Sequence, residues 1–287
     1  MASTTTPIVP LPFPTYFTAL SAVYAKQTGN TTRNIFAATL PDITALAPIT
    51  PTSTIHDNAA GPGTATSVLV DPHLGLLPES PSSILVTDNV AAMVSAARDS
   101  FASLHRPNVT VQELDSLSLS TVPDSSITHS ILNFSIFTMA DPLKCLQETR
   151  RTLASDGGIA ALLTWRRWGA GEIVHAAQRI VRPDLPVMKI PGREFMDEGV
   201  LEKLTVEAGF ERTKITVLEK TLLVKEDGEE MAGLKEFLVG VATGPAKIGW
   251  TEEEAARWPE AVEQAVRDEV RVHGGVLFQA WVVLARK

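Results

Sequence analysis

The chain of 287 residues has one cysteine, Cys145, and no apolar run that approaches the length of a membrane span. A single cysteine excludes a disulfide within the chain and a zinc site built from several thiolates. A transmembrane helix needs ~20 apolar residues in a row, so none is expected. Residues 1–14 carry no positive charge before their short apolar stretch, unlike a secretory signal. We therefore expect a cytoplasmic protein.

Basic residues are also scarce, because 25 Lys and Arg stand against 33 Asp and Glu, and the formal net charge is −8. Binding to nucleic acid or to an anionic membrane needs clustered Lys and Arg, so neither partner is expected. The histidines form no His-x-x-His or His-Glu-x-x-His pair, and no acid-rich loop of the metal-binding type is present, so we expect no metal. The absence of Gly-x-Ser-x-Gly excludes an α/β-hydrolase.

The chain does contain enough apolar sequence, 44% of its residues, to bury a large core. Between residues 53 and 165, short apolar segments alternate with segments of helical periodicity. This order predicts βαβ units in a parallel sheet with helices on both faces. The expected strands are 53–57, 84–87, 109–114, 127–134 and 159–164, and the expected helices are 64–70, 90–104 and 141–153.

Further elements are expected on either side of this region. Before it we expect helices at 16–26 and from Thr31 or Thr32 to Leu46; after it, helices at 171–181 and 197–208, a strand at 214–218, charged helices within 225–275 and a last strand at 276–285. We interpret 1–287 as a single domain with an N-terminal helical cap at 1–50, a ligand-binding half at 53–165, cap or insertion segments at 166–275 and the last strand at 276–287.

The segment DNAAGPG at 57–63 follows the first expected strand and precedes a helix. Small residues allow a tight turn and bring main-chain amides close to a ligand. The dinucleotide fingerprint G-x-G-x-x-G fails, because Thr66 occupies the place of the third glycine, and no Gly-Lys-Ser/Thr of a phosphate loop follows. The segment is either a ligand-binding turn led by an acid or a plain turn between strand and helix.

Two further acids follow the next strands. Asp88 comes at the end of the second strand and Asp115 after the third, so with Asp57 they are expected to face one crevice at the carboxyl ends of parallel strands. An acid at the second strand suits both hydroxyls of a ribose, and one after the third suits the exocyclic amine of a purine. Met93, one helical turn beyond Asp88, is placed to pack on the base. Each acid alone is also explained as a helix N-cap, Asp88 above all; the three together favour a nucleoside.

These segments give the chain a resemblance to a known family. The stretches IHDNAAGPGTAT, ILVTDNVAAMVSAAR, VTVQELDSL, ITHSILNFSIFTMADPLKCLQETRRTLASDGGIAALLTW and FQAWVVLARK resemble the class I S-adenosylmethionine-dependent methyltransferases. The likeness is greatest to the small fungal secondary-metabolite branch, which includes the gliotoxin thiol-methyltransferase type. It implies a doubly wound, Rossmann-like α/β sheet of seven strands in the order 3-2-1-4-5-7-6, with the last strand antiparallel, and a helical cap.

The resemblance also implies which residues hold S-adenosylmethionine. The turn led by Asp57 matches the glycine-rich turn under the methionine part, with Ala59 in place of its first glycine. Asp88 matches the ribose-binding acid, the Leu-Asp pair at 114–115 the adenine edge, and Asn133 the strand end near the methionine amino group. The implied cofactor contacts are Asp57, Ala59, Gly61, Gly63, Asp88, Asn89, Met93, Leu114, Asp115 and Asn133.

The methyl acceptor is expected to be a small hydrophobic metabolite bound by the helical cap. Tyr16, Tyr24, Trp165 and Trp168 are candidates to line its pocket, and both tyrosines are equally suited to helix packing. His175 is the weak candidate for a general base, which a phenol, enol or thiol acceptor needs and a pre-ionised one does not. Oxygen is the favoured accepting atom, with sulfur and nitrogen close behind.

Two other functions stay open on the same fold. One is a cyclase or isomerase that keeps S-adenosylmethionine intact, and the other is a non-catalytic, cofactor-binding regulatory subunit, which the retained acids and glycines disfavour. Three further residues receive structural interpretations: His56 is expected to be packed, His129 to lie at the surface or sheet edge, and Cys145 to lie in the core or half-buried.

Overall fold

The computed structural model describes residues 30–77 and 79–287. The helix expected at 16–26, with Tyr16 and Tyr24, lies outside the described residues. The chain divides into two compact units. Among the described residues, unit 1 consists of Asn30, Thr31, Arg167–Ile190 and Thr221–Gln279, and unit 2 consists of Thr32–Arg166, Pro191–Lys220 and Ala280–Lys287.

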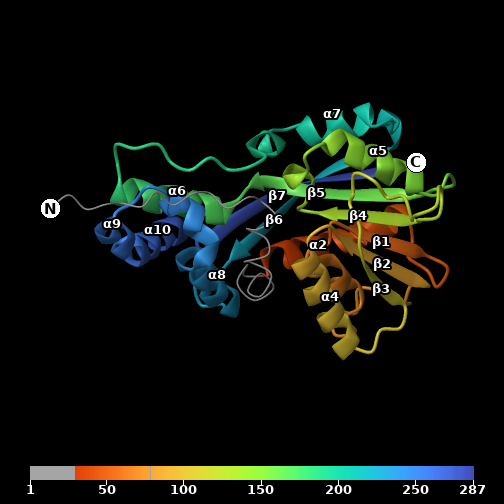
Figure 1. Ribbon diagram of the computed structural model, residues 1–287, viewed down its shortest axis with the longest axis horizontal. Coiled ribbons are helices and arrows are strands. Elements are labelled where there is room, and N and C mark those ends of the chain that lie inside the picture. The colour runs from red at the N-terminus through yellow and green to blue at the C-terminus, as the bar shows by residue number, and fades with distance from the viewer. Residues whose placement is uncertain (1–29, 78) are drawn as a thin grey trace. The chain divides into compact units, whose positions relative to one another are not determined.

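A seven-stranded sheet has the order β3-β2-β1-β4-β5-β7-β6 (Figure 1). Its strands are β1 (Thr54–Asn58), β2 (Ser83–Asp88), β3 (Val109–Glu113), β4 (His129–Asn133), β5 (Ile159–Arg167), β6 (Ile215–Val224) and β7 (Val276–Arg286). The first five of these strands pair in parallel, and β7 runs in the opposite direction to β5. The expectation of a doubly wound sheet in this order is confirmed.

The helices between the strands follow local sequence signals. They are α2 (Thr31–Leu46), α3 (Thr64–Leu69), α4 (Ala91–Ser103), α5 (Pro142–Thr152), α6 (Gly169–Val181), α7 (Val200–Glu207), α8 (Glu229–Val239), α9 (Glu252–Ala256) and α10 (Trp258–His273). Asp141 caps α5 by accepting the amide of Lys144 over 2.9 Å. Thr251 and Glu254 form a reciprocal capping box at α9. Such caps satisfy amides that have no partner within the helix.

The strand register brings the ends of neighbouring strands together. Asn58, the last residue of β1, pairs with Thr87 of β2, and Asp88 pairs with Glu113, the last residue of β3. On the other side of β1, Asp57 pairs with Ile131 of β4. The segments that follow β1, β2, β3 and β4 therefore all leave the sheet at the carboxyl ends of its strands, where ligands of open α/β sheets bind.

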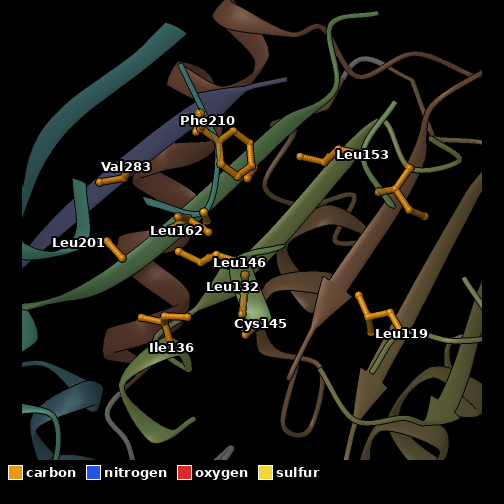
Figure 2. Close-up of a cluster of buried hydrophobic side chains, with 14 of the residues drawn as sticks. Leu119, Leu132, Ile136, Cys145, Leu146, Leu153, Leu162, Leu201, Phe210 and Val283 are labelled. Atoms are coloured by element: carbon orange, nitrogen blue, oxygen red, sulfur yellow. The ribbon is translucent and has the colours of Figure 1, made fainter. Parts of the chain in front are cut away.

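A cluster of buried apolar side chains in unit 2 packs α5 against the central strands of the sheet (Figure 2). Leu132 of β4 and Leu162 of β5 pack against Leu146 and Cys145 of α5, and all four are fully buried. Burying a leucine side chain contributes roughly 1.5–3 kcal/mol, so this face is firmly held. Cys145 therefore lies in the core, as expected.

Two strands are longer than the sequence predicts. β5 continues to Arg167, and β6 has ten residues rather than the five expected at 214–218. Both extensions contain charged residues, which made them look unlike strands in the sequence. Arg166 of β5 pairs with Glu219 of β6 over 3.0 Å and stacks 5.2 Å from the ring centre of Trp281. Charged pairs of this kind are compatible with an exposed strand face. Because they lower the local hydropathy, a prediction from hydropathy ends the strand too early.

The expectation for His129 is wrong. This residue begins β4 as predicted, but it is 4% exposed, and its Nε2 atom lies 3.0 Å from the carbonyl oxygen of Ala47. The segment that follows α2 covers it and supplies a hydrogen-bond acceptor. A polar side chain can be buried when such a partner exists, and sequence alone does not reveal that partner.

Unit 1 has its own apolar centre around Trp258. This side chain is 1% exposed, donates its indole N–H to the carbonyl of Leu238 over 2.9 Å and meets Trp250 edge-on at 5.6 Å. Arg167 pairs with Glu269 over 2.8 Å. Within residues 30–77 and 79–287, none of the helices has the length and apolar content of a membrane span.

Candidate cofactor site

The turn between β1 and α3 has a positive φ at three positions. Ala59, Gly61 and Gly63 have φ angles of 52°, 57° and 85°. The amide of Ala60 donates to the carbonyl of Thr87 over 2.9 Å, and the amide of Gly63 donates to the carbonyl of Ala60 over 3.0 Å. An L-residue adopts the left-handed conformation at a cost of roughly 1–2 kcal/mol. The alanine at the first position therefore carries strain that the two glycines avoid.

The two glycines serve different needs. A Cβ atom on Gly63 would lie 2.5 Å from the ring of Phe101 in α4, so packing requires a glycine there. A Cβ atom on Gly61 would meet, among the described residues, only the Sδ atom of Met93, at 4.0 Å. The main chain at Gly61 therefore has open space beside it, with a buried methionine at the margin of that space.

The Asp57 carboxylate is bonded within the fold through one oxygen, while its buried Oδ1 atom has no hydrogen-bond partner among the described residues, so its contact with a ligand stays a prediction. The residue is fully buried, and its Oδ2 atom accepts both the amide of Thr66 over 2.9 Å and the Thr66 hydroxyl over 2.7 Å. Thr66 lies in the first turn of α3, so the carboxylate ties the strand to the start of the helix. Burial raises the pKa of Asp57 to about 6, against the opposing effect of both hydrogen bonds.

Asp88 holds two main-chain groups at the end of β2. Its Oδ2 atom accepts the amide of Gly61 over 2.8 Å, and its Oδ1 atom accepts the amide of Val90 over 2.9 Å. Burial raises the pKa of Asp88, and the bonds from Val90 and Gly61 oppose that rise. Asp88 is 9% exposed, and each of its carboxylate oxygens has a second lone pair. The carboxylate can therefore still accept ribose hydroxyls. Asn89 beside it is exposed.

The Leu-Asp pair at 114–115 follows β3 next to Asp88. The amide of Leu114 donates to the Asp88 carbonyl over 3.0 Å. Asp115 is exposed, and its Oδ1 atom accepts the amide of Leu117 over 2.9 Å. Asp115 is therefore an exposed carboxylate close to the end of β2. The structure thus brings the predicted ribose and adenine acids to neighbouring strand ends.

The end of β4 has an unusual backbone and a free acceptor. The buried Oδ1 atom of Asn133 has no hydrogen-bond partner within residues 30–77 and 79–287. Phe134 has a φ of 58°, which is rare for a bulky residue, and its ring centre lies 4.1 Å from that of Trp165. Strained backbone of this kind is found at functional sites, where surrounding packing enforces it. The unpartnered oxygen is suited to a cationic N–H donor.

The acceptor candidates fall in different places. Trp165 of unit 2 is 7% exposed and stacks on Phe134. Trp168 of unit 1 precedes α6. Its ring packs closely on Gly171, because a Cβ atom added to Gly171 would lie 2.5 Å from a ring carbon of Trp168. His175, also in unit 1, has its Nε2 atom 2.9 Å from the carbonyl oxygen of Met188. Contact of these residues with an acceptor stays a prediction.

Unit 1 also contains a cavity of about 380 Å³ whose lining includes Arg182, Leu185, Lys189 and Trp250. Gln178, which also lines it, donates to the carbonyl of Ala246 over 2.8 Å and accepts the amide of Met188 over 3.0 Å. In the part of the chain that the structure describes, no group of three or more His, Cys, Asp or Glu is placed to hold a metal ion.

Sequence reasoning missed the polar residues that hold this site together. Thr66, noted only as a failed glycine position, is the partner of Asp57. Ser116 donates to Asn58 over 2.7 Å, and His56, packed as expected, lies 2.8 Å from the hydroxyl of Thr87. The sequence contained one signal for Thr66, because a hydroxyl and an unpaired amide in the first turn of a helix can both donate to a nearby carboxylate. The other pairs are distant in sequence and carried no signal.

Comparisons with known proteins agree with this geometry. Residues 57–161 match a family described as a methyltransferase domain. The protein "Methyltransferase ucsB" of Acremonium sp. is 30% identical over 139 residues, 46% of this chain and 47% of that protein, so the chain spans about half the length of the curated relative it matches. The matched segment is therefore similar to a methyltransferase domain, which agrees with S-adenosylmethionine as the cofactor expected from sequence.

Solved structures show the same fold. YcgJ of Bacillus subtilis has a TM-score of 0.52 at 14% identity and covers 87% of this chain and 98% of its own. SpnF, described as a [4+2]-cyclase, has a TM-score of 0.52 at 17% identity and covers 88% of this chain and 81% of its own. At these identities the likeness establishes the Rossmann-like fold. The open backbone at Gly61 and the unpartnered Asn133 oxygen fit the amino acid end of the cofactor.

Proposed function

We propose that this chain transfers a methyl group from S-adenosylmethionine to a small hydrophobic metabolite, as in the fungal secondary-metabolite branch. One observation carries the proposal. The open main chain at Gly61, the carboxylates of Asp88 and Asp115, and the free oxygen of Asn133 lie at the carboxyl ends of adjoining parallel strands in unit 2. The cofactor presents a cationic amine, a ribose diol and an adenine amine, which are the donors that these acceptors require.

Each group has a definite role in this proposal. Asp88 accepts the ribose hydroxyls with Asn89 beside it, Asp115 accepts the adenine amine, and Asn133 accepts the methionine ammonium. Met93 packs on the adenine, since its sulfur already borders the open space at Gly61. One oxygen of Asp57 holds Thr66 at the start of α3, and its other oxygen, which has no partner among the described residues, stays a candidate cofactor contact.

The bound cofactor supplies an activated methyl group with a neutral leaving group. The chain then needs to orient the acceptor in line with that group and to exclude water. A pre-ionised acceptor needs no base. For a phenol, enol or thiol, His175 is the candidate base: with its Nε2–H donated to the Met188 carbonyl, Nδ1 is the nitrogen that takes the proton.

The acceptor is bound by the segments between 166 and 275, with Trp165 and Trp168 as its aromatic contacts. Flat apolar side chains suit an apolar metabolite, and a single polar base suits an acceptor with one acidic group. Oxygen is the favoured accepting atom, followed by sulfur and nitrogen.

A labelled-methyl assay tests the proposal. The purified chain is incubated with methyl-labelled cofactor and a set of phenolic, thiol and amine metabolites, and products are analysed by mass spectrometry. Methyl transfer predicts a labelled product and an equal amount of S-adenosylhomocysteine. Tight cofactor binding without any labelled product from the whole set would contradict it.

A cyclase is the second candidate, because SpnF shows that the same fold occurs in a protein described as a [4+2]-cyclase. It predicts a product of unchanged mass, formed only when the cofactor is present, and no S-adenosylhomocysteine. The same experiment therefore separates the two functions, and binding without any product would favour a regulatory subunit.

A further inference from the structure

A buried side-chain bridge joins the glycine turn to the loop that carries Asp115. The hydroxyl of Ser116, a residue 4% exposed, donates to Oδ1 of Asn58 over 2.7 Å. Asn58 is fully buried and directly precedes the turn, and Ser116 directly follows Asp115. The two partners are 58 positions apart, so this bond is a tertiary constraint between two parts of the proposed cofactor site.

The bridge continues into α5. The Nδ2 atom of Asn58 lies 3.5 Å from the hydroxyl oxygen of Thr149, which is also fully buried. The preceding residue, Glu148, accepts the amide of Leu119 over 2.9 Å. The loop is therefore held beside the glycine turn by Asn58 and at its far end by α5.

The carboxylate of Asp115 depends on these neighbours for its position. It is exposed, and its Oδ1 atom accepts only a local amide bond, from Leu117, among the contacts within the described residues. On one side the amide of Leu114 is bonded to the Asp88 carbonyl, and on the other Ser116 is bonded to Asn58. These two anchors determine where the carboxylate stands relative to the turn.

We propose that Asn58 and Ser116 are positioning residues that hold the Asp115 carboxylate where it distinguishes adenine from other bases. This inference rests on the proposed function, in which Asp115 accepts the adenine amine. An acceptor distinguishes a donor from another acceptor only when distance and angle are well defined. A fixed carboxylate therefore favours the amine and repels a carbonyl oxygen in its place, whereas a loosened loop moves away from either group.

The test compares two ligands by calorimetry. One is S-adenosylhomocysteine, and the other is its inosine analogue, in which a carbonyl oxygen replaces the adenine amine. We expect the wild-type chain to prefer the adenosine ligand by at least tenfold and Ser116→Ala to lose about tenfold of that preference, the effect of one hydrogen bond. Ser116→Thr, which keeps the hydroxyl, should retain most of the preference.

Two controls separate positioning from general stability. Ser130 is equally buried, and its hydroxyl has no partner in the described part of the chain, so Ser130→Ala should leave the preference unchanged. In the double variant with Asp115→Ala, Ser116→Ala should cause no further loss of preference, because both changes remove the same contact. Melting temperatures are measured for every variant.

The outcomes are distinguishable. A wild-type chain that fails to bind S-adenosylhomocysteine would overturn the proposed function together with this inference. A wild-type chain that binds both ligands equally, or a Ser116→Ala variant with unchanged preference, would overturn the inference alone. Equal loss in Ser116→Ala and Ser130→Ala, in step with lower melting temperatures, would also overturn it, because the bridge would then be structural only.

Discussion

The Oδ2 atom of Asp88 accepts the main-chain amide of Gly61 over 2.8 Å. The proposed ribose-binding acid is therefore also a support of the glycine turn. In the proposed function, ribose and turn share this carboxylate, so we expect a change at Asp88 to act on the cofactor both directly and through the shape of the turn. Experiments at this position need to separate the two effects.

Asp88→Asn should weaken binding of S-adenosylhomocysteine about ten- to a hundredfold, because a charge-assisted acceptor is lost. The amide keeps one oxygen for a main-chain N–H but turns its NH₂ group toward the other, so a lower melting temperature is also expected. Calorimetry at a temperature where the variant is folded measures the affinity. An unchanged dissociation constant would remove Asp88 from the site.

Gly61→Val should abolish cofactor binding while the fold remains. The side chain would occupy the open space beside the main chain and would adopt an unfavourable φ. Gly75 is a matched control, with a φ of 58° and nothing within 4 Å among the described residues. Gly75→Val should show the same backbone strain without loss of binding. Equal cofactor binding by both variants would show that the turn at Gly61 does not contact the cofactor.

Ala59→Gly should stabilise the chain. Ala59 has a φ of 52°, and relief of the left-handed strain contributes roughly 1–2 kcal/mol, reduced by the greater freedom of glycine in the unfolded chain. A net gain of about 1 kcal/mol corresponds to a rise of roughly 2–4 °C in melting temperature. A lower melting temperature would contradict the strain at this position. Cofactor affinity should stay within a factor of a few.

Asp57 and His56 should have opposite effects on the pH dependence of stability. Burial raises the pKa of Asp57 to about 6 and lowers the pKa of His56 to about 4. The contribution of Asp57 is present at low pH and is lost as pH rises from about 4 through 6. The contribution of His56 is present above about pH 6.5 and is lost as pH falls through 4. The two slopes oppose each other in the same window.

Asp57→Asn removes the Asp57 contribution to the pH dependence of the free energy of unfolding. The variant should lose stability more steeply than the wild type as pH falls from about 6.5 to 4, because the His56 effect is no longer opposed. Urea unfolding at several pH values measures this. Parallel profiles for the two proteins would show that Asp57 keeps an ordinary pKa.

Trp165→Ala should reduce both stability and turnover. The side chain is buried and stacks on Phe134, and truncating such an aromatic costs about 3–5 kcal/mol. Trp165→Phe keeps a ring there, so it should retain stability and still impair use of the acceptor more than cofactor binding. Acceptor KM and kcat and cofactor Kd are measured on folded protein. Equal damage to both ligands would make Trp165 a structural residue.

The sequence by itself determined the alternation of strands and helices in a parallel sheet, the placement of the turn at 57–63 and the acids that follow the strands, whereas the strand order was implied by the family resemblance. Alternating periodicity and turn residues are local signals, and parallel strands joined by helices leave few arrangements. Strand ends then locate Asp88 and Asp115 without any knowledge of packing. The short strand expected at 214–218 failed because charged residues paired across the sheet, such as Arg166 and Glu219, hide a strand from hydropathy.

Only the tertiary structure decided what those side chains touch. It turned Asp57 toward Thr66, buried His129 against Ala47 and joined Ser116 to Asn58. Burial and hydrogen bonding depend on partners from other elements, and the last two pairs join residues more than fifty positions apart. A residue's type states which bonds it can form, but the free energy that selects one of them comes from the packing that excludes water.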